Sequence, residues 1–460
     1  MSYQKHVHLI GIGGISMSGI AKILLKNNII VSGSDIKNNH LIEELREKGA
    51  KVYIGHSKEN IKNPDLVIIS SAIPKNNPEL KMAQKKNIKV LKRAEYIAEL
   101  MKEKKSIAIS GTHGKTTTTG MISTIFKKAD LAPTILLGGE LNEIGGNVFK
   151  GSGDYLITEA DESDGSLLYF DPLISVITNI EFDHLDYYNS KNKLINTFKK
   201  FIEKSRGTSV VCIEDKNIKN IVNNIDDDFI SYGINNGDLQ GYNIQILPFG
   251  SLFEVKNKEK ILGEINLQIP GKYNILNALA ATAVGLYCGL DFREIKKGLE
   301  SFSGVKRRFE KKGLINNILI IDDYAHHPTE IKETLNAAQN TGYERIIAVF
   351  QPHRYSRTKN LFSDFVNSFK NVDHLIILDI YSAGEKPENE DDKKRARDLA
   401  REISKKYDFN VDFIKNIEDV TSYLQEIMIP KDLILTIGAG DVYKIGENLI
   451  KILNEKREMA

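Results

Sequence analysis

A glycine-rich loop carries the clearest chemical signal in this sequence. The stretch Gly111–Thr116 (GTHGKT) follows the apolar run Ser106–Ser110, a predicted strand, and precedes a helical pattern. Glycines let such a loop point backbone N–H groups at a phosphate, Lys115 supplies a positive charge for β- and γ-phosphates, and the Thr116 hydroxyl can bind Mg²⁺. Ile109 stands where the first glycine of the usual phosphate loop is expected. The alternative is a turn with a surface lysine, but the order strand, loop, helix favours phosphate binding.

Carboxylates and a histidine follow two further predicted strands. The residues concerned are Glu159, Asp161, Glu162 and Asp164 after the first strand, and Asp183, His184 and Asp186 after the second. Ligands of an open parallel sheet bind beyond the carboxyl ends of its strands, so we expect these side chains to lie near the glycine-rich loop. Carboxylates hold Mg²⁺, and a neutral imidazole can also bind a metal. Each segment alone is typical of a solvated loop, but together they indicate a metal site.

Two later segments carry side chains suited to a nucleotide. Asn274 and Asn277 lie three residues apart, hence on one face of a predicted helix, and their amides could bind the polar edge of a nucleobase. The alternative is a helix cap plus a surface amide. In the run Lys306–Phe309 (KRRF), an arginine could reach a transferring phosphoryl group or merely solvate a linker.

The amino-terminal segment Gly11–Ser16 (GIGGIS) is similar to the fingerprint of dinucleotide-binding sites, with Asp35 at the end of the next predicted strand. Ser16 stands in place of the third glycine, so the match to a nicotinamide site is imperfect. The segment still predicts a diphosphate near a helix N-terminus.

Histidines and arginines gather at adjacent strand ends in the last third of the chain. The segments Asp322–Pro328 (DDYAHHP) and Gln351–Arg357 (QPHRYSR) each follow an apolar run. Planar guanidinium groups at such positions suit a carboxylate or phosphate ligand, with structural ion pairs as the alternative.

The elements that must position these groups form three blocks of alternating strands and helices. The 460 residues are about three times the length of one domain. We expect an α/β fold with three domains: a Rossmann-like domain over residues 1–104, a central domain like that of P-loop ATPases over residues 105–308, and a Rossmann-like domain over residues 309–460. The central domain should combine a mostly parallel sheet with a small antiparallel sheet. The acidic stretch Gly384–Lys394 is expected to be a solvated loop.

Composition excludes several classes of protein. Hydrophobic residues make up 41% and charged residues 27%, a globular balance, and a net charge of +2 does not fit a polycation that coats nucleic acid. Apolar runs such as Leu66–Ile69 are far shorter than the ~20 residues of a membrane span. Two cysteines cannot form a disulfide framework or a zinc site. No leader precedes the first predicted strand, so we expect a cytoplasmic protein with no nucleic-acid or membrane partner.

With these motifs in this order, the sequence resembles the Mur ligases over nearly its whole length. The resemblance implies an enzyme that uses ATP and Mg²⁺ to join L-alanine to the lactyl carboxylate of UDP-N-acetylmuramate through an acyl phosphate, in peptidoglycan precursor synthesis. The first domain would hold the UDP-sugar, the second ATP, and the third the amino acid. A monomer or weak homodimer is expected.

The resemblance also assigns the candidate residues by motif. ATP would be bound by Gly111, Thr112, His113, Gly114, Lys115, Thr116, Thr117, Asn274, Asn277, Arg308 and Asp323. Thr116, Glu159 and His184 would bind metal, while Lys115, His184 and Arg308 would act in catalysis. The UDP-sugar would be bound by Gly11, Gly13, Gly14, Ser16 and Asp35. The amino acid or the acyl group would be bound by His326, His353, Arg354 and Arg357.

Two positions depart from the family pattern, since Ser16 often is glycine and Tyr273 often is histidine in its members. The base that deprotonates the incoming amine is not evident, and His184 and His353 are the candidates. A related ligase that recycles a tripeptide is one alternative function. A nicotinamide-dependent oxidoreductase would leave the glycine-rich loop unexplained, and a non-catalytic phosphate-loop module would not need the acids and histidine.

Overall fold

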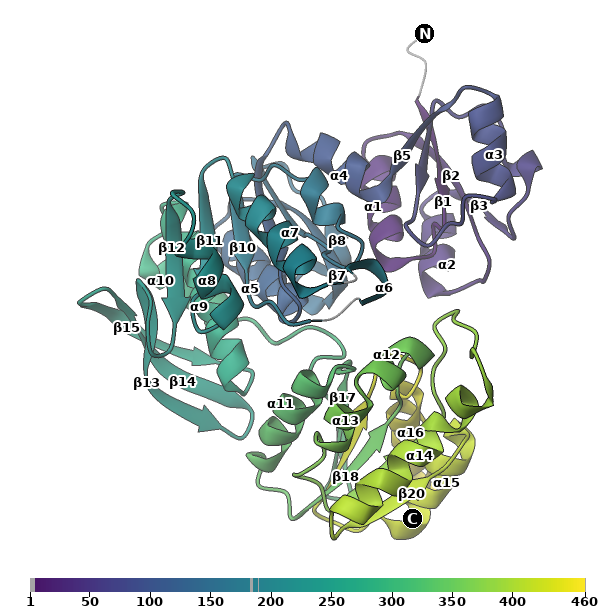
Figure 1. Cartoon of the computed structure of the whole chain (residues 1–460), viewed down its shortest axis with the longest axis vertical. Coiled ribbons are helices and arrows are strands. Elements are labelled where there is room, and N and C mark those ends of the chain that lie inside the picture. Colours follow the sequence, from purple (N-terminus) through teal and green to yellow (C-terminus); the bar gives the residue numbers. More distant parts are fainter. Residues whose placement is uncertain (1–4, 183–184, 189, 460) are drawn as a thin grey trace. The chain divides into compact units, whose positions relative to one another are not determined.

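The computed structural model of the chain (Figure 1) describes residues 5–182, 185–188 and 190–459. Its strands form three sheets of five, ten and six strands, as the prediction of a three-domain α/β protein requires. The chain divides into two compact units. The first unit comprises Met1–Ile244, Phe253–Leu267 and Asn274–Ser303, and the second comprises Gln245–Leu252, Gln268–Tyr273 and Gly304–Ala460.

Five parallel strands in the order β3-β2-β1-β4-β5 form the first sheet. The strands are β1 (His6–Ile10), β2 (Ile30–Asp35), β3 (Lys51–Ile54), β4 (Leu66–Ile69) and β5 (Lys89–Lys92). The helices are α1 (Ile15–Lys26), α2 (His40–Glu47), α3 (Pro78–Lys85) and α4 (Arg93–Met101). The strand order reverses on either side of β1, so the glycine-rich turn between β1 and α1 lies at the switch point where ligands bind such sheets.

The second sheet has the order β15-β14-β13-β12-β11-β10-β6-β9-β7-β8. Its strands are β6 (Lys105–Ser110), β7 (Thr134–Leu141), β8 (Gly146–Phe149), β9 (Tyr155–Glu159), β10 (Ile174–Ile177), β11 (Thr208–Cys212), β12 (Phe229–Gly233), β13 (Leu239–Leu247), β14 (Gly250–Asn257) and β15 (Lys260–Leu267). Its helices are α5 (Lys115–Lys128), α6 (Leu185–Tyr188), α7 (Lys191–Glu203), α8 (Lys216–Val222), α9 (Lys272–Tyr287) and α10 (Phe292–Glu300). Strands β13 to β15 are joined by turns too short for any but antiparallel neighbours, and they continue the large sheet through β12.

Strand β6 determines where the site of the first unit lies. It pairs in parallel with β10 on one side and with β9 on the other, so the carboxyl ends of all three strands meet at one edge. The glycine-rich loop leaves β6 at this edge and enters α5. Helix α5 packs against α10 so closely that a Cβ on Gly298 would lie 2.6 Å from Ile125 Cα. The segments that follow β9 and β10 therefore flank a loop that is held by a buried helix.

The third sheet is mixed and has the order β16-β17-β21-β18-β19-β20. Its strands are β16 (Glu310–Ile315), β17 (Ile318–Asp323), β18 (Arg345–Phe350), β19 (His374–Ile377), β20 (Asn410–Phe413) and β21 (Asp432–Ile437). The helices are α11 (Pro328–Gln339), α12 (Tyr355–Asn360), α13 (Phe362–Val366), α14 (Glu390–Lys406), α15 (Ile417–Ile427) and α16 (Tyr443–Met459). Only the β16–β17 pair is antiparallel among the strand pairs of this sheet in the described residues.

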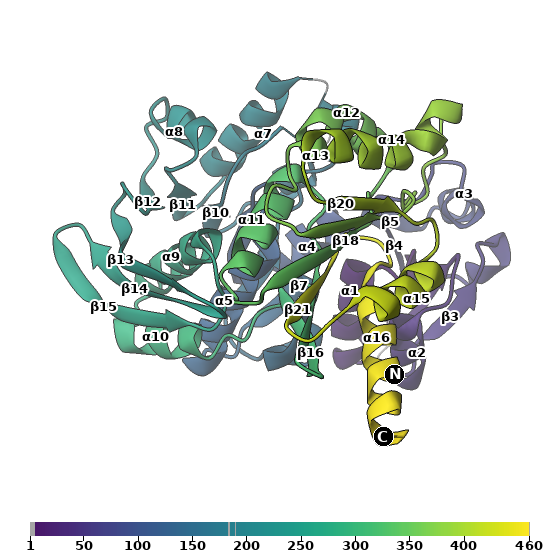
Figure 2. The ribbon, with the colours of Figure 1, turned by 90° about the horizontal axis from the view of Figure 1, so that it is seen from below.

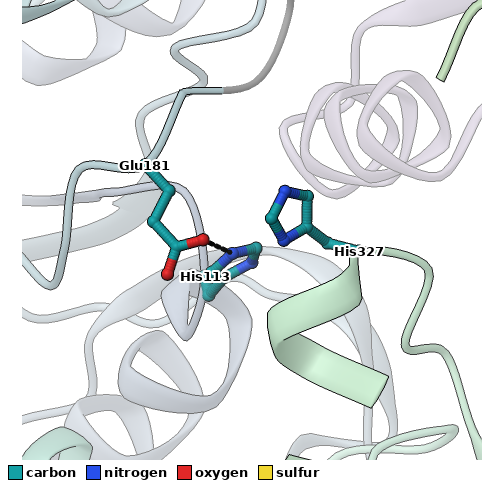
Figure 3. A group of neighbouring side chains, drawn as sticks. All are labelled: His113, Glu181 and His327. Carbon is teal, nitrogen blue, oxygen red and sulfur yellow. Dashed lines mark hydrogen bonds and ion pairs between the residues drawn. The ribbon is translucent and has the colours of Figure 1, made fainter. Parts of the chain in front are cut away.

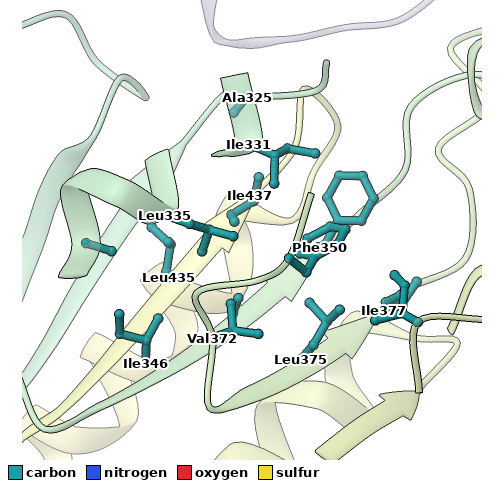
Figure 4. Packing of buried hydrophobic residues seen from close by; sticks show 14 of the residues in the cluster. Ala325, Ile331, Leu335, Ile346, Phe350, Val372, Leu375, Ile377, Leu435 and Ile437 are labelled. Atoms are coloured by element: carbon teal, nitrogen blue, oxygen red, sulfur yellow. The ribbon is translucent and has the colours of Figure 1, made fainter. Parts of the chain in front are cut away.

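Alternating residues along the strands of the third sheet pack into two hydrophobic cores, one on each face of the sheet. On β17, Leu319 and Ile321 belong to a cluster that also takes in α11, α13 and α14. Figure 4 shows part of this cluster, with Ile331 and Leu335 of α11 beside the sheet. Ile318 and Ile320 face the opposite cluster, with α15 and α16. Helices thus cover both faces of the sheet (Figure 2), which explains why its strands read as continuous apolar runs in the sequence.

One expected loop is partly helical. Helix α14 begins at Glu390, so the prediction of a solvated loop is wrong for residues 390–394. The Asn389 side chain accepts a hydrogen bond from Asp392 N at 2.9 Å and caps the helix. Acids in a first turn are stabilised by the positive end of the helix, so the charge density read as a loop signal is a helix-start signal. Within the described ranges, no helix has both the length and the apolar character that a membrane crossing requires.

Candidate functional site

The glycine-rich loop has a shape that requires glycine at both ends. Gly111 has a φ of +136° and Gly114 a φ of +81°, in the region that side chains disfavour. A Cβ on Gly111 would lie 2.1 Å from Thr178 Oγ1, and one on Gly114 would lie 2.6 Å from Asn277 Oδ1. Gly114 is also the N-cap residue of α5 and has no side chain to offer the first N–H groups of the helix. The loop therefore forms a cradle at a helix N-terminus, which fits the phosphates of a nucleotide.

The segment after β10 braces this loop from the side. Thr178 Oγ1 donates to His113 O at 2.6 Å, and Asn179 Oδ1 accepts from His113 N at 2.8 Å. The Thr112 hydroxyl accepts from Glu181 N at 2.8 Å, and the Glu181 carboxylate lies 3.4 Å from His113 Nε2 (Figure 3). Thr178, Asn179 and Glu181 are not among the site residues predicted from the sequence. Their position directly after a strand expected near the loop is the signal that could have found them.

The Lys115 ammonium is folded back onto its own loop. Its Nζ donates to Gly111 O at 2.5 Å and to Thr112 O at 3.1 Å, and it pairs with Glu162 Oε1 at 2.9 Å. Burial lowers the pKa of Lys115, but neighbouring carboxylates, Glu162 foremost, outweigh burial and raise it. The side chain is therefore charged at neutral pH. A phosphate that enters the cradle would take over the ammonium from the loop carbonyls.

Two carboxylates at the end of β9 lie beside this ammonium. Glu159 Oε1 accepts a hydrogen bond from Gly138 N at 2.7 Å, and a Cβ on Gly138 would come within 2.8 Å of that carboxylate. Asp161 Oδ2 lies 3.4 Å from Arg93 Nη2. Burial raises the pKa of Asp161, but the positive charges of Lys115 and Arg93 outweigh it and lower that pKa. Asp161 is therefore ionised, as a Mg²⁺ site requires.

A cavity of about 230 Å³ joins the phosphate loop to the amino-terminal fingerprint. Ser16, at the start of α1, lines the cavity together with Lys115, Glu159 and Asp161, and Arg93 contributes from the start of α4. The two segments of the sequence that separately predict a phosphate therefore open into one space. A ligand whose diphosphate lies at α1 and a nucleotide whose triphosphate lies at α5 would both extend into this cavity.

Asp35 braces the amino-terminal loop from within. Its Oδ2 accepts from Gly13 N at 2.9 Å, and a Cβ on Gly13 would lie 3.0 Å from the same oxygen. Gly11 N donates to Ser34 O at 2.8 Å, and Gly14 is the N-cap residue of α1. In this structure the carboxylate of Asp35 is used to shape the loop.

The asparagine pair is tied to the phosphate-loop helix. Asn277 is buried and its Oδ1 accepts from Thr118 Oγ1 at 3.1 Å, while its Nδ2 donates to Asn274 Oδ1 at 3.3 Å. This contact joins α9 to α5 and holds the floor of the cradle at Gly114. Asn277 is thus placed to support the loop, and Asn274 is the more accessible amide of the two.

In the second unit, Asp323 and Arg308 are also held by local partners. The Asp323 carboxylate accepts from Phe309 N at 2.8 Å and from Ala325 N at 2.7 Å, and burial raises its pKa to about 6. Arg308 Nη1 lies 3.5 Å from Glu330 Oε1. Asp323, the last residue of β17, therefore holds the segment that carries Arg308 against the third sheet.

The histidines and arginines expected at the amino-acid site cluster in the second unit. The rings of His326 and His353 lie 5.8 Å apart, His353 Nδ1 lies 3.2 Å from Arg357 Nη1, and the ring of Tyr381 stacks on His353 at 5.6 Å. Arg354 Nη1 lies 3.7 Å from Glu385. This cluster presents cationic and neutral donors, which suits an anionic group of a ligand.

Two histidines of this cluster are weak bases. Burial lowers the pKa of His326 to about 4, and burial together with His326 and Arg357 lowers that of His353 to about 3. So weak a base does not compete for the proton of an ammonium group, which argues against His353 as the base. The other candidate, His184, lies outside the described residues, as do Asp183 and the side chain of Asp186.

The low pKa of His353 predicts a loss of stability in acid. The pKa is about 3 in the folded chain against an ordinary value of 6.5. The folded state therefore loses no stability through this group above the higher value, and it loses stability progressively as the pH falls toward the lower. Lowering the pH from about 7.5 to about 5 should remove on the order of 1–2 kcal/mol through this group. The measurement is the urea midpoint at the two pH values. His353→Gln, which keeps a partner for Arg357, should show a smaller drop in this midpoint than the wild type. An equal drop in the urea midpoint of the variant would contradict the lowered pKa of His353.

Comparison with known protein families matches three stretches of the chain. Residues 6–105 match the model described as "Mur ligase family, catalytic domain", residues 109–285 match "Mur ligase middle domain", and residues 307–440 match "Mur ligase, glutamate ligase domain". The order of the three models follows the order of the three sheets.

Individual relatives match along nearly the whole chain. UDP-N-acetylmuramate–L-alanine ligases of Clostridium botulinum (strain Okra) and Clostridium tetani are each 49% identical, over 98% of this chain and 98% and 99% of their own. The crystal structure of a UDP-N-acetylmuramate–alanine ligase from Thermotoga maritima has a TM-score of 0.85 and 29% identity over 98% of this chain and 99% of its own. A murein peptide ligase from Psychrobacter arcticus, 21% identical with a TM-score of 0.74 over 98% of each chain, shares the fold.

Proposed function

Because the chain belongs to the Mur ligase family, we propose that it uses ATP to join L-alanine to the lactyl carboxylate of UDP-N-acetylmuramate. It is an ATP-dependent carboxylate–amine ligase whose products are UDP-N-acetylmuramoyl-L-alanine, ADP and phosphate. Relatives 49% identical over nearly their full length carry this activity in their names. The nicotinamide-dependent oxidoreductase is not supported, and the same relatives favour L-alanine over the tripeptide as the acceptor.

The chemistry requires activation of a carboxylate. A carboxylate oxygen of the lactyl group attacks the γ-phosphorus of ATP, ADP leaves, and an acyl phosphate forms. The alanine amine then attacks the acyl carbon, and inorganic phosphate departs with the former carboxylate oxygen. No covalent bond to the protein is needed, so the protein contributes position and positive charge.

The first step is assigned to the cavity between α1 and α5. The loop from Gly111 to Thr117 would hold the ATP phosphates, with Lys115 on the γ-phosphate. The UDP-sugar would be held at the N-terminus of α1 by Gly11, Gly13, Gly14, Ser16 and Asp35, with its diphosphate against the helix end. The single observation that carries the proposal is that Ser16 and Lys115 line one cavity, since a carboxylate and a γ-phosphate must meet for the transfer.

A divalent metal ion fits the donors present. The Thr116 hydroxyl and the carboxylate of Glu159 are hard oxygen ligands of the kind that Mg²⁺ prefers, and Glu159 is oriented by Gly138 N. His184 is proposed as a ligand of a second metal from the family resemblance alone. When bound, Mg²⁺ would neutralise charge on the phosphates. Asp161, paired with Arg93 at 3.4 Å, is a further carboxylate in the same cavity.

The Mg²⁺ requirement gives a prediction for Glu159. Glu159→Gln keeps an acceptor for Gly138 N but lacks the negative charge, so it should raise the Mg²⁺ concentration for half-maximal rate about tenfold or more. A matched control is Glu214→Gln, because Glu214 also accepts backbone hydrogen bonds, from Ile234 N and Asn235 N. A metal titration of phosphate release should shift for the first variant only. Equal curves for both variants would remove Glu159 from the metal site.

Each domain of the chain is assigned one substrate. We propose residues 1–104 as the UDP-sugar domain, 105–308 as the ATP domain and 309–460 as the amino-acid domain, with Arg307 and Arg308 at the last boundary packed against the third sheet. Asn274, Asn277 and Asp323 would bind the nucleotide, with Arg308 at the γ-phosphate. His326, His353, Arg354 and Arg357 would contact the alanine or the acyl group. The reaction belongs to the cytoplasm, which supplies ATP, and a monomer or weak homodimer is sufficient for it.

Phosphate release tests the proposed function. ATP and Mg²⁺ would be incubated with UDP-N-acetylmuramate alone, with L-alanine alone, with both, and with the tripeptide in place of alanine. Release that requires the sugar nucleotide and L-alanine together is the expected result. Release only with the tripeptide would move the activity to peptide recycling, and no release in any arm would refute the ligase.

A further inference from the structure

Arg307 has three hydrogen-bond acceptors in the second unit although it lies in the run that connects two sheets. Its Nε donates to Asp322 Oδ2 at 2.9 Å, its Nη1 to Gly440 O at 3.1 Å, and its Nη2 to Gly438 O at 2.7 Å. Asp322 is fully buried at the end of β17, and the two carbonyls follow β21. The guanidinium fork therefore closes the carboxyl edge of two adjacent parallel strands.

Aromatic rings and the backbone complete the attachment. The guanidinium carbon of Arg307 lies 4.5 Å from the ring centre of Tyr443 and 5.1 Å from that of Tyr324. Its backbone N donates to Glu310 Oε2 at 2.8 Å and its carbonyl accepts from Tyr324 N at 2.6 Å. The residue has a φ of +60°, a conformation that a non-glycine residue adopts only where its surroundings hold it.

Arg308 is thereby fixed between two anchors. On one side stands Arg307, and on the other Phe309 N donates to the Asp323 carboxylate at 2.8 Å. Arg308 itself lies 3.5 Å from Glu330 and 5.1 Å from the ring centre of Tyr324. Every one of these partners belongs to the second unit. The run that carries Arg308 is therefore part of the third sheet's edge rather than a free linker.

We propose that Arg307 is the positioning residue that attaches Arg308 to the second unit, so that Arg308 reaches the transferring phosphoryl group only as part of that unit. This inference rests on the proposed function, in which Arg308 contacts the γ-phosphate. Arg307 itself does not touch the phosphate, because its three donor directions are taken by Asp322 and the two glycine carbonyls. Its contribution is geometric and depends on the planar fork.

Arg307→Lys separates position from charge. Lysine keeps the positive charge but cannot reach three separate acceptors with a fixed fork. If Arg307 acted by charge, Arg307→Lys would retain kcat. If it positions Arg308, kcat should fall on the order of 10- to 100-fold, the range for displacing a group that touches the reacting atoms. The KM for UDP-N-acetylmuramate should stay near the wild-type value, because that substrate is assigned to the first unit.

The chain contains a matched control at the opposite edge of the same sheet. Arg345 donates to Asp432 from Nε at 2.9 Å and from Nη2 at 2.6 Å, and to Ile427 O at 2.7 Å. It stands at the start of β18, away from the carboxyl ends of the strands. Arg345→Lys should cost comparable stability and leave kcat unchanged.

Two measurements on the full chain decide the question. The first is a kinetic cycle with Arg308→Lys: because Arg307 acts through Arg308, adding Arg307→Lys to Arg308→Lys should lower kcat little further. The second is limited trypsin digestion without substrates, in which Arg307→Lys should speed cleavage within Lys306–Phe309 and Arg345→Lys should not. The proposal would be overturned if Arg307→Lys left the cleavage rate or kcat unchanged. It would also be overturned if Arg307→Lys and Arg308→Lys lowered kcat by independent factors that multiply in the double variant. The digestion does not depend on activity, so an inactive wild type would refute the ligase assignment and leave the attachment of the run tested separately.

Discussion

Lys115→Ala is expected to lower kcat about 10³-fold or more, the range seen when a cation at a transferring phosphoryl group is lost. The ammonium lies at the mouth of the phosphate cradle, 2.9 Å from Glu162 and within hydrogen-bonding distance of two loop carbonyls. It is charged at neutral pH and needs only to exchange those carbonyls for phosphate oxygens. Its removal takes away the one lysine that the loop itself provides. The measurement is kcat for phosphate release with both substrates saturating.

The control for this variant must separate charge loss from misfolding. Lys204 also pairs with a carboxylate, Asp171 at 2.9 Å, and donates to Leu168 O at 2.7 Å, outside the cradle. Lys204→Ala should keep kcat. The double variant Lys115→Ala with Glu162→Gln removes the buried negative charge that the single variant leaves behind, so it should regain stability but not activity. Near wild-type kcat in Lys115→Ala would contradict the role of the loop.

Gly111→Ala is expected to lose both stability and activity. The residue has a φ of +136°, and an added Cβ would lie 2.1 Å from Thr178 Oγ1 and 3.0 Å from Asn179 O. Backbone strain and overpacking together should cost about 3 kcal/mol or more. Any relaxation moves Thr178 or Asn179, which brace the loop through His113, so kcat should fall as well. Urea unfolding and phosphate release measure the two effects.

Gly145→Ala is the matched control for Gly111→Ala. Gly145 also has a positive φ, +71°, but no atom lies within 4 Å of an added Cβ. It should cost only about 1–2 kcal/mol of backbone strain and leave kcat unchanged. The difference between the two variants isolates the close approach of the loop to the segment after β10. If both variants behaved alike, the cradle would not require its observed shape.

The arrangement of the first unit could largely be predicted from the sequence, because parallel strands bring their carboxyl ends to one edge. Glu159, Asp161 and Lys115 come together for this reason: β9 and β6 are neighbours. The position of Arg93 could not be predicted, since it depends on how α4 packs beside the second sheet. That contact is set by packing between segments far apart in the chain, which local patterns do not record.

Residue type and spacing also do not distinguish a group that binds a ligand from one that braces the loop. Asp35 is predicted at the UDP-sugar, and its carboxylate also accepts a hydrogen bond from Gly13 N at 2.9 Å. Asn277 is predicted at the nucleotide, and its Oδ1 also accepts a hydrogen bond from Thr118 Oγ1 at 3.1 Å. Conversely, Asn179 is not among the predicted site residues, and its Oδ1 accepts a hydrogen bond from His113 N at 2.8 Å. The partner of a polar side chain is decided by tertiary packing.

The central claim is that the lactyl carboxylate becomes an acyl phosphate, and transfer of a labelled oxygen tests it most directly. UDP-N-acetylmuramate labelled with heavy oxygen in the lactyl carboxylate would be incubated with ATP, Mg²⁺ and L-alanine, and the released phosphate would be analysed by mass spectrometry. The account predicts one labelled oxygen in each inorganic phosphate, because the carboxylate oxygen that attacks the γ-phosphorus leaves with it when the amine attacks the acyl carbon. Phosphate released without label, while the alanine product forms, would contradict it.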